Sequence, residues 1–150
     1  MLKIILPAMM ILMTLPGISS RNAQAQSLDL SVFQWKSRLL FLFAPNRNHP
    51  MFDALHTSLA ARQSEASDRD LVIFEILESD ASSMNNESID SETVRLLREK
   101  FGIRPAEFTV ILIGKDGRIK LDRKKQTQLD DIFARIDSMP MRQEEMRQRD

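Results

Sequence analysis

The stretch Arg38-Leu-Leu-Phe-Leu-Phe-Ala-Pro-Asn-Arg-Asn-His-Pro50 decides how this sequence folds. Residues 38–44 form an almost continuous apolar run, which is typical of a strand covered on both faces of a sheet. Asn48 or His49 can cap the helix that follows, and Pro50 suits its first turn. A buried strand therefore leads through a short polar loop into the start of a helix.

Further elements follow from the spacing of apolar residues. Phe52, Leu55 and Leu59 predict a helix that ends near Arg62. A second apolar run over residues 71–77 predicts another buried strand, joined to the first by a parallel crossover. The next helix is predicted to begin at Asp90 or Ser91, to turn Val94, Leu97 and Phe101 inward, and to end at Gly102.

The last third of the sequence predicts a hairpin and a helix. Residues 108–113 form an apolar strand, and Asp116-Gly117 suits a tight turn, so that Ile119 and Leu121 return antiparallel to it. A helix is then predicted from a stripe at positions i, i+3, i+4 and i+7, ending before Pro140: Leu129, Ile132, Phe133 and Ile136.

Three other segments carry weaker patterns. Leu28, Val32 and Trp35 share one helical face, which predicts a short helical turn packed before the first strand. Residues 63–69 are polar and are predicted to be a connection. Residues 78–88, rich in Ser, Asn, Asp and Glu, are predicted to be an exposed loop.

The predicted order is therefore strand, helix, strand, helix, strand, strand, helix. This order is typical of a thioredoxin-like α/β fold, with a central mixed sheet and helices on both faces. A small parallel sheet of the dinucleotide-binding sort would need a Gly-rich turn after the first strand and a further crossover after Ile113. The sequence offers neither.

The chain contains no cysteine. Thioredoxin-like proteins keep a reactive cysteine where the first strand meets the following helix, and no other side chain replaces a thiolate in disulfide exchange or peroxide attack. Thiol oxidoreductase and peroxidase activities are therefore excluded.

The first residues have the layout of a secretory signal peptide. Lys3 precedes an apolar run over residues 4–15, and Ala23-Gln24-Ala25 offers small residues at alternate positions. We expect residues 1–25 to be removed by cleavage after Ala25, which gives a periplasmic or secreted protein. A membrane anchor is the alternative, but the run is shorter than the roughly 20 residues that a spanning helix needs. We therefore expect no membrane insertion after signal removal.

The remaining chain divides into a domain over residues 26–138 and a charged tail over residues 139–150. The whole sequence has 21 Lys and Arg against 21 Asp and Glu, so removal of Lys3 and Arg21 leaves it slightly acidic. Such a balance provides no long-range attraction to nucleic acid. We expect the partner to be a protein or a small ligand, bound by a local patch.

Three segments resemble one family: Trp35–Pro45, Phe108–Gly117 and Ile136–Met146, the last of which contains Met-Pro-Met-Arg. They are similar to the bacterial branch of the domain of unknown function 4174 family. That family is itself similar to peroxiredoxin-like domains, and it also occurs in vertebrate secreted proteins with sushi repeats. The resemblance implies a thioredoxin-like fold but no particular reaction.

The peroxiredoxin motif Pro-x-x-x-Thr-x-x-Cys can be laid on Pro45, and the resemblance then shows what this sequence lacks. His49 falls at the threonine position and Phe52 at the cysteine position. Phe108 stands where thioredoxin-like folds keep a proline before the third strand. These departures imply that the domain does no redox work.

The loop Asn46-Arg47-Asn48-His49 is the first candidate ligand site. A helix N-terminus presents free backbone N–H groups and a partial positive charge, which suits an anion, and Arg47 can add a bidentate contact. The alternative is structural: Asn48 caps the helix and Arg47 is solvated.

Two further features bear on metal binding and on buried charge. His49, Asp53 and His56 follow one another at helical spacing, but Pro50 distorts the first position and no third histidine or cysteine completes a set, so we expect no metal and no cofactor. Glu75 lies inside an apolar strand, where a buried carboxylate would need a partner. We expect it to lie at the sheet margin or to pair with an arginine.

The corner Met139-Pro140-Met141-Arg142 is the second candidate, as an interaction surface, although the two methionines equally suit a tail tucked against the core. The function that we favour is a non-catalytic binding or interaction module. The alternative is a non-thiol enzyme or small-anion-binding protein that uses Arg47, His49 and Asp53. A third possibility is a partner subunit that depends on the chemistry of a separate thiol protein.

Overall fold

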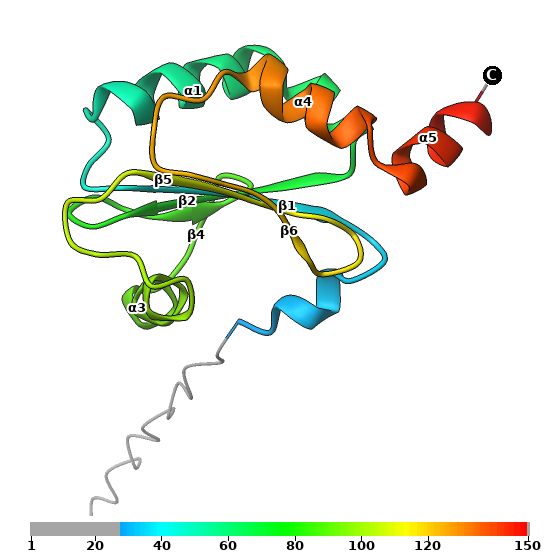
Figure 1. Cartoon of the computed structure of the whole chain (residues 1–150). Coiled ribbons are helices and arrows are strands. Elements are labelled where there is room, and N and C mark those ends of the chain that lie inside the picture. The colour runs from blue at the N-terminus through cyan, green and yellow to red at the C-terminus, as the bar shows by residue number, and fades with distance from the viewer. Residues whose placement is uncertain (1–27, 150) are drawn as a thin grey trace, which may run out of the picture.

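The computed structural model describes residues 28–149, and the predicted signal peptide lies outside them. Six strands form one sheet in the order β4-β3-β2-β1-β5-β6 (Figure 1). Strands β1 and β2 are parallel and the other neighbours are antiparallel. The strands are β1 (Arg38–Ala44), β2 (Leu71–Leu77), β3 (Ser83–Met84), β4 (Glu87–Ser88), β5 (Thr109–Ile113) and β6 (Ile119–Arg123).

Helices cover both faces of this sheet. Figure 1 shows α1 and α4 on one face and α3 on the other. The helices are the 3₁₀ turn η1 (Leu30–Phe33), α1 (Pro50–Ala61), α2 (Gln63–Asp68), α3 (Ser91–Lys100), α4 (Leu129–Asp137) and α5 (Pro140–Arg147). The thioredoxin-like prediction, with its mixed central sheet, is confirmed.

Strand β1 is buried along its whole length because both of its faces are covered. Successive side chains of a strand point to opposite faces, so Leu40 and Leu42 pack under α1 and α4 while Phe41 and Phe43 pack toward α3. Phe41 stacks on Phe74 of β2 with ring centroids 4.4 Å apart. Aromatic pairs of this kind add about 1 kcal/mol beyond their buried area.

The predicted helix boundaries agree with the structure at several points. Helix α1 begins at Pro50 and ends at Ala61, and His49 is its N-cap residue without a side-chain cap bond. Helix α3 is capped by Asp90, whose carboxylate accepts from the backbone N–H of Thr93. The apolar stripe of α4 is buried throughout.

The prediction for residues 28–35 was wrong about which side chains pack. Val32 is 54% exposed and Trp35 is 63% exposed. Leu28 packs on the core as predicted, whereas Leu30 and Phe33 pack there in place of Val32 and Trp35. Trp35 has a φ of +65°, and its N–H donates to the carbonyl of Lys115, so the chain leaves helical geometry before this ring can turn inward.

Two segments predicted to be irregular are regular in the structure. Residues 63–68 form α2, separated from α1 by the non-helical Arg62, whose guanidinium bonds Glu65 one turn later. Residues 83–88 form a small hairpin that extends the sheet beside β2. Ser82 is buried at its base, because its hydroxyl accepts from the N–H of Leu77 and donates to the carbonyl of the same residue.

The charged tail is also ordered. Pro140 ends α4 as predicted, but it begins a second helix, α5, which extends to Arg147. Helix α5 lies at the end of the molecule beyond α4 (Figure 1). Side-chain contacts from Arg142 and Glu145 join this helix to the domain.

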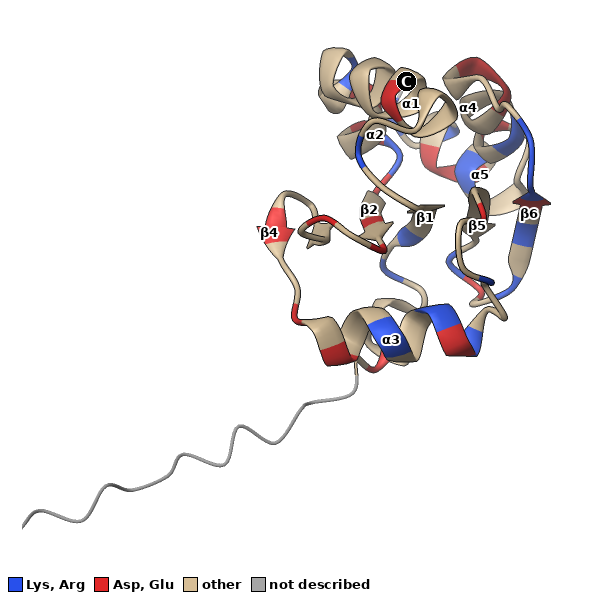
Figure 2. Ribbon diagram, turned by 90° about the vertical axis from the view of Figure 1, so that its left-hand side faces the viewer, with Lys and Arg blue, Asp and Glu red and all other residues tan. Residues whose placement is uncertain are grey.

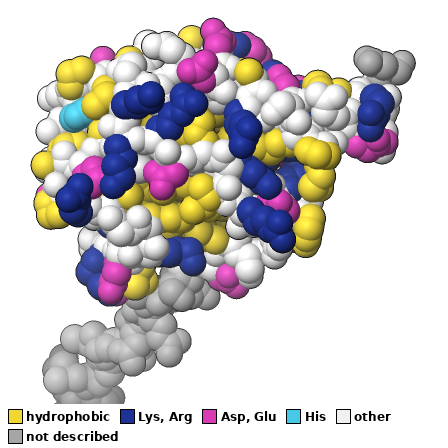
Figure 3. All heavy atoms as spheres, viewed as in Figure 1, with side chains coloured by type: hydrophobic (Ala, Val, Ile, Leu, Met, Phe, Trp, Pro, Cys, Tyr) yellow, Lys and Arg dark blue, Asp and Glu magenta, His cyan; other side chains and the backbone are white. Residues whose placement is uncertain are grey.

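The charges are mixed rather than segregated. Helices α3 and α5 each carry both basic and acidic positions (Figure 2). On the face drawn in Figure 3, basic side chains are interspersed with acidic and hydrophobic ones. Within residues 28–149, no helix has the length and apolar character required to cross a membrane.

Candidate functional site

The position of the peroxiredoxin motif is filled by packed rings. Phe52 is fully buried, and Phe108 lies in the same core cluster. The ring of His49 stacks on that of Phe108, with centroids 5.3 Å apart and planes 3° from parallel. The positions that match the reactive residues of peroxiredoxins, His49, Phe52 and Phe108, therefore lie in the core or at its margin.

The loop of residues 46–49 already holds a carboxylate of this chain. The backbone N–H of Arg47 donates to Asp80 Oδ2 over 2.7 Å, and the guanidinium of Arg47 donates to the carbonyl of Ala81. Asp80 thus takes up one N–H of the loop that was predicted to bind an anion. Asn46 and Asn48 are partly or largely exposed beside it, and no contact joins Arg47, His49 and Asp53 into a catalytic group among the described side chains.

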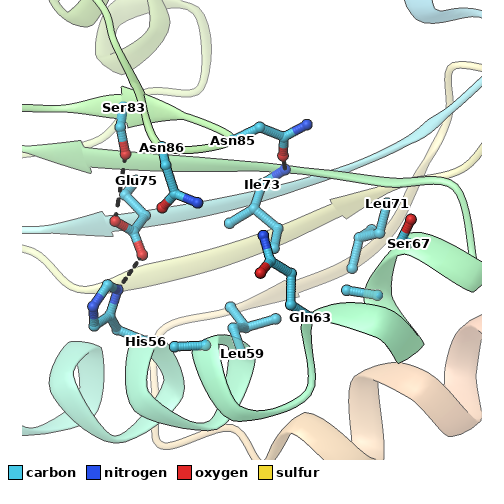
Figure 4. A pocket seen from close by; sticks show the side chains of 12 residues that line it. His56, Leu59, Gln63, Ser67, Leu71, Ile73, Glu75, Ser83, Asn85 and Asn86 are labelled. Atoms are coloured by element: carbon cyan, nitrogen blue, oxygen red, sulfur yellow. Dashed lines mark hydrogen bonds and ion pairs between the residues drawn. The ribbon is translucent and has the colours of Figure 1, made fainter.

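A cavity of about 280 Å³ lies elsewhere, between α1, α2 and the β2–β4 end of the sheet. Apolar side chains form part of its wall and polar side chains form the rest (Figure 4). Its lining residues are His56, Leu59, Ala60, Gln63, Ala66, Ser67, Leu71, Ile73, Glu75, Ser83, Asn85 and Asn86. We call it the β2 cavity.

Glu75 and His56 meet at one end of the β2 cavity. The Nδ1 atom of His56 lies 2.5 Å from Oε1 of Glu75 (Figure 4). Glu75 is 6% exposed and His56 about one-third exposed. An ionised carboxylate can only accept, so Nδ1 is the donor when Glu75 is ionised. The other oxygen, Oε2, has a single long contact of 3.4 Å, from the hydroxyl of Ser83.

The rest of the polar wall comes from the hairpin that was predicted to be a loop. Asn85 and Asn86 have φ angles of +47° and +68° and form its turn. Asparagine tolerates this left-handed region better than most residues. The side-chain oxygen of Asn85 accepts from the N–H of Ile73 over 2.8 Å, which holds the hairpin beside β2. The cavity thus depends on a turn that closes over the strand.

A second cluster of charged side chains lies at the start of β1, around Arg38. Arg38 is 1% exposed and donates two parallel bonds of 3.1 Å to Glu145 of α5. Lys115 contacts Glu145 and Asp70, each over 2.7 Å. Burial by itself raises the pKa of Glu145, yet the bonds from Arg38 and Lys115 outweigh it and leave that pKa below its ordinary value.

Arg142 belongs to the same cluster, which we call the C-terminal charge network. It is 3% exposed, and its guanidinium bonds Asp68 and Asp137. Its bond also holds the pKa of Asp68 below the ordinary value. Of the four residues predicted as an interaction corner, Arg142 is therefore committed within the chain and Met139 packs on the core. Pro140 and Met141 remain exposed.

The geometry of the described residues brings no group of three or more His, Asp, Glu or Cys side chains together in a way that could hold a metal ion. His49 packs on Phe108, and His56 faces Glu75 instead. The two histidines therefore make separate contacts and do not face a common point.

The family follows from comparison with known sequences. The profile of the family described as "Domain of unknown function (DUF4174)" matches residues 29–145. The chain belongs to the DUF4174 family. As a DUF4174 domain, it is 26% identical over 133 residues to coiled-coil domain-containing protein 80 of Danio rerio, covering 78% of this chain and 15% of that protein. It is 27% identical over 137 residues to sushi repeat-containing protein SRPX2 of Xenopus laevis, covering 89% of this chain and 30% of that protein.

Solved structures similar to this DUF4174 domain include peroxiredoxins. The reduced 2-Cys peroxiredoxin of Plasmodium vivax has a TM-score of 0.58 and 12% identity, with 77% of this chain and 84% of that chain covered. The mitochondrial 2-Cys peroxiredoxin of Plasmodium falciparum has a TM-score of 0.54 and 13% identity, with 74% and 80% covered. At such identities the likeness establishes the fold alone.

Sequence reasoning missed the pairing that defines the β2 cavity, although both residues were noticed separately. Glu75 shares a strand face with Ile73 and Leu77, which pack under α1. His56 continues the stripe of Phe52 and stacks on that ring, 5.6 Å away. The sequence did contain a signal for this pairing. His56 is a polar residue beside the apolar stripe of the helix, and Glu75 is a polar residue on the covered face of the strand. Glu75 pairs with this histidine rather than with an arginine.

Proposed function

We propose that this DUF4174 domain is a non-catalytic binding module and that the β2 cavity takes a small ligand. The observation that carries the proposal is the buried carboxylate of Glu75, which lies in a cavity with one of its oxygens only weakly bonded. Binding sites typically combine apolar walls with a few convergent polar groups, and this cavity has that composition.

The arrangement of polar groups supports binding over catalysis. A histidine oriented by a carboxylate resembles two members of a hydrolytic triad, but the third member would be a hydroxyl bonded to the histidine. The nearby hydroxyl of Ser83 contacts Glu75 instead of His56. The anion-binding alternative at residues 46–49 is less well supported, because Asp80 accepts the N–H of Arg47 there.

We also propose that the protein is exported, on the strength of Lys3, the apolar run over residues 4–15 and the Ala23-Gln24-Ala25 segment. Mass spectrometry of the protein recovered from a secreting host tests this directly. A mature N-terminus at Gln26 would support export, and an intact first residue in the soluble cell fraction would contradict it.

A blocking substitution tests the binding site. Small molecules are screened against the protein by changes in backbone amide signals, and hits are repeated on Ala60→Trp, which places a large ring at the cavity wall. Ala61→Trp is the matched control, because Ala61 is an exposed neighbour on α1 that does not line the cavity.

We expect Ala60→Trp to abolish binding and Ala61→Trp to leave it unchanged. Hits whose signals map to residues 46–49 and survive Ala60→Trp would favour the anion-binding alternative. Turnover of a hit, lost on substitution of His56, would favour an enzyme.

A further inference from the structure

The charge of the β2 cavity restricts what it can bind. Its lining contains the carboxylate of Glu75 and no lysine or arginine. The arginines nearest along α1 and α2 are committed elsewhere: Arg62 bonds Glu65 and Asp130, and Arg69 bonds Asp137. Glu75 is therefore the acid of this lining, with no lysine or arginine among the lining residues to offset it, so the cavity disfavours anions and suits a cation.

Hydrogen-bond acceptors lie close together at the polar end of the cavity. Oε2 of Glu75 lies beside the hydroxyl of Ser83, and the amide of Asn86 extends into the same space (Figure 4). An ammonium group has three N–H donors and no acceptor, so it matches such a set of oxygens. A hydroxyl brings a single donor and no charge to the same place.

The remainder of the wall is apolar. Leu71 lies at the end of the cavity away from His56, Leu59 and Ile73 line its middle, and Gln63 projects between Leu59 and Leu71 (Figure 4). A short hydrocarbon stem along these side chains would gain roughly 0.8 kcal/mol for each buried methylene. The cavity therefore has a charged end and an apolar end within one small volume.

We propose that the ligand of the β2 cavity is a short primary alkylammonium, whose ammonium group pairs with Glu75 and whose hydrocarbon stem lies along Leu59 and Ile73. This inference rests on the proposed function, because it names the chemical class of ligand for the same site. It excludes anions, which were the ligands expected of the loop at residues 46–49.

The test compares three probes of the same length on the unmodified protein: n-butylammonium, 1-butanol and butyrate, each titrated while backbone amide signals are followed. We expect butylammonium to shift the signals of Leu59, Ile73 and Glu75, butanol to bind at least tenfold more weakly, and butyrate to leave these signals unchanged.

Substitution provides the second arm. Glu75→Gln retains the shape and removes the charge, so butylammonium should bind at least tenfold more weakly. Asp53→Asn, an exposed carboxylate on the same helix as His56 and outside the cavity, should have no effect. The comparison of probes on the unmodified protein still decides the question if Glu75→Gln fails to fold.

The outcomes separate the two proposals. Butanol or butyrate binding in the cavity as tightly as butylammonium would overturn the ammonium assignment and leave the binding function standing. Butylammonium binding that is insensitive to Glu75→Gln would also overturn it. Failure of the three probes and of the wider screen to move any cavity signal would count against both proposals.

Discussion

The C-terminal charge network holds a half-buried carboxylate and the β2 cavity a buried one, and the two are bonded to different extents. Both oxygens of Glu145 are bonded by Arg38, and Lys115 adds a further contact. Glu75 has one short bond, to His56, and its second oxygen faces a cavity. A buried charge that its own chain fully satisfies serves stability, whereas one left partly satisfied beside a cavity is available to a ligand.

The C-terminal charge network includes part of the Met-Pro-Met-Arg segment. Met139 and Arg142 of that segment pack against this same chain, while Pro140 and Met141 stay exposed. Arg142 joins α5 to Asp68 at the end of α2 and to Asp137 in α4, while Glu145 joins α5 to β1. The motif stabilises the attachment of the last helix.

The largest loss of stability should come from removing Glu145, the carboxylate whose two oxygens are both bonded. Glu145→Ala leaves the buried guanidinium of Arg38 without its carboxylate, and removal of one partner from a buried pair typically costs about 3 kcal/mol. The free energy of unfolding in urea measures this loss.

Glu144→Ala is the matched control, because Glu144 lies on the same helix and contacts only the exposed side chains of Arg147 and Gln148. It should leave the urea midpoint almost unchanged. Equal effects of the two substitutions would mean that the network contributes no more than a surface pair.

Acid should release α5 before the rest of the domain unfolds. The pKa values of Glu145 and Asp68 lie below their ordinary values of 4.5 and 3.8. Depressed pKa values contribute stability that is present above the ordinary values and is lost as the pH falls through the lower, folded-state values. Amide hydrogen exchange in α5 should therefore accelerate as the pH falls below the ordinary values of 4.5 and 3.8, while β1 stays protected. Uniform acceleration in α5 and β1 would contradict a local release.

A smaller effect is expected at the turn that closes the β2 cavity. Asn85→Ala removes the acceptor for the N–H of Ile73 and places a less tolerant residue at a φ of +47°, which should cost about 1 kcal/mol. Asn86→Gly, at the neighbouring position with positive φ, should be close to neutral. Thermal unfolding measures the stability of both variants. An equal loss of stability in Asn86→Gly and Asn85→Ala would contradict a specific role for the bond from Ile73 to Asn85.

The smallest effect on stability is expected from Glu75→Gln. The amide keeps the shape of the carboxylate, retains a bonding partner for His56 and faces a cavity that admits water, so the change should stay below about 1 kcal/mol. The same urea experiment measures it beside Glu145→Ala. A loss as large as that of Glu145→Ala would make Glu75 a structural residue like Glu145 and remove the contrast between the two regions.

Local patterns in the sequence were sufficient for the elements that bury continuous apolar surface. Strand β1, the stripe of α4 and the cap of α3 at Asp90 were predicted because hydrophobic period, capping and breaker residues all act within a few positions. Together with the absence of cysteine, they determined the thioredoxin-like fold and excluded thiol chemistry. The orientation of Trp35 was not predicted, since it depends on a bond to Lys115 in a distant hairpin.

The tertiary structure alone decided which charged residues are partners. His56 meets Glu75 across 19 positions of sequence, and Arg38 meets Glu145 across 107. Side-chain pairing at such separations is set by strand order and helix packing, which a single sequence does not encode in any local period. The sequence therefore determined what the core is made of, and the packing of α1 over β2 and of α5 against β1 decided which carboxylate is satisfied and which is open to a ligand.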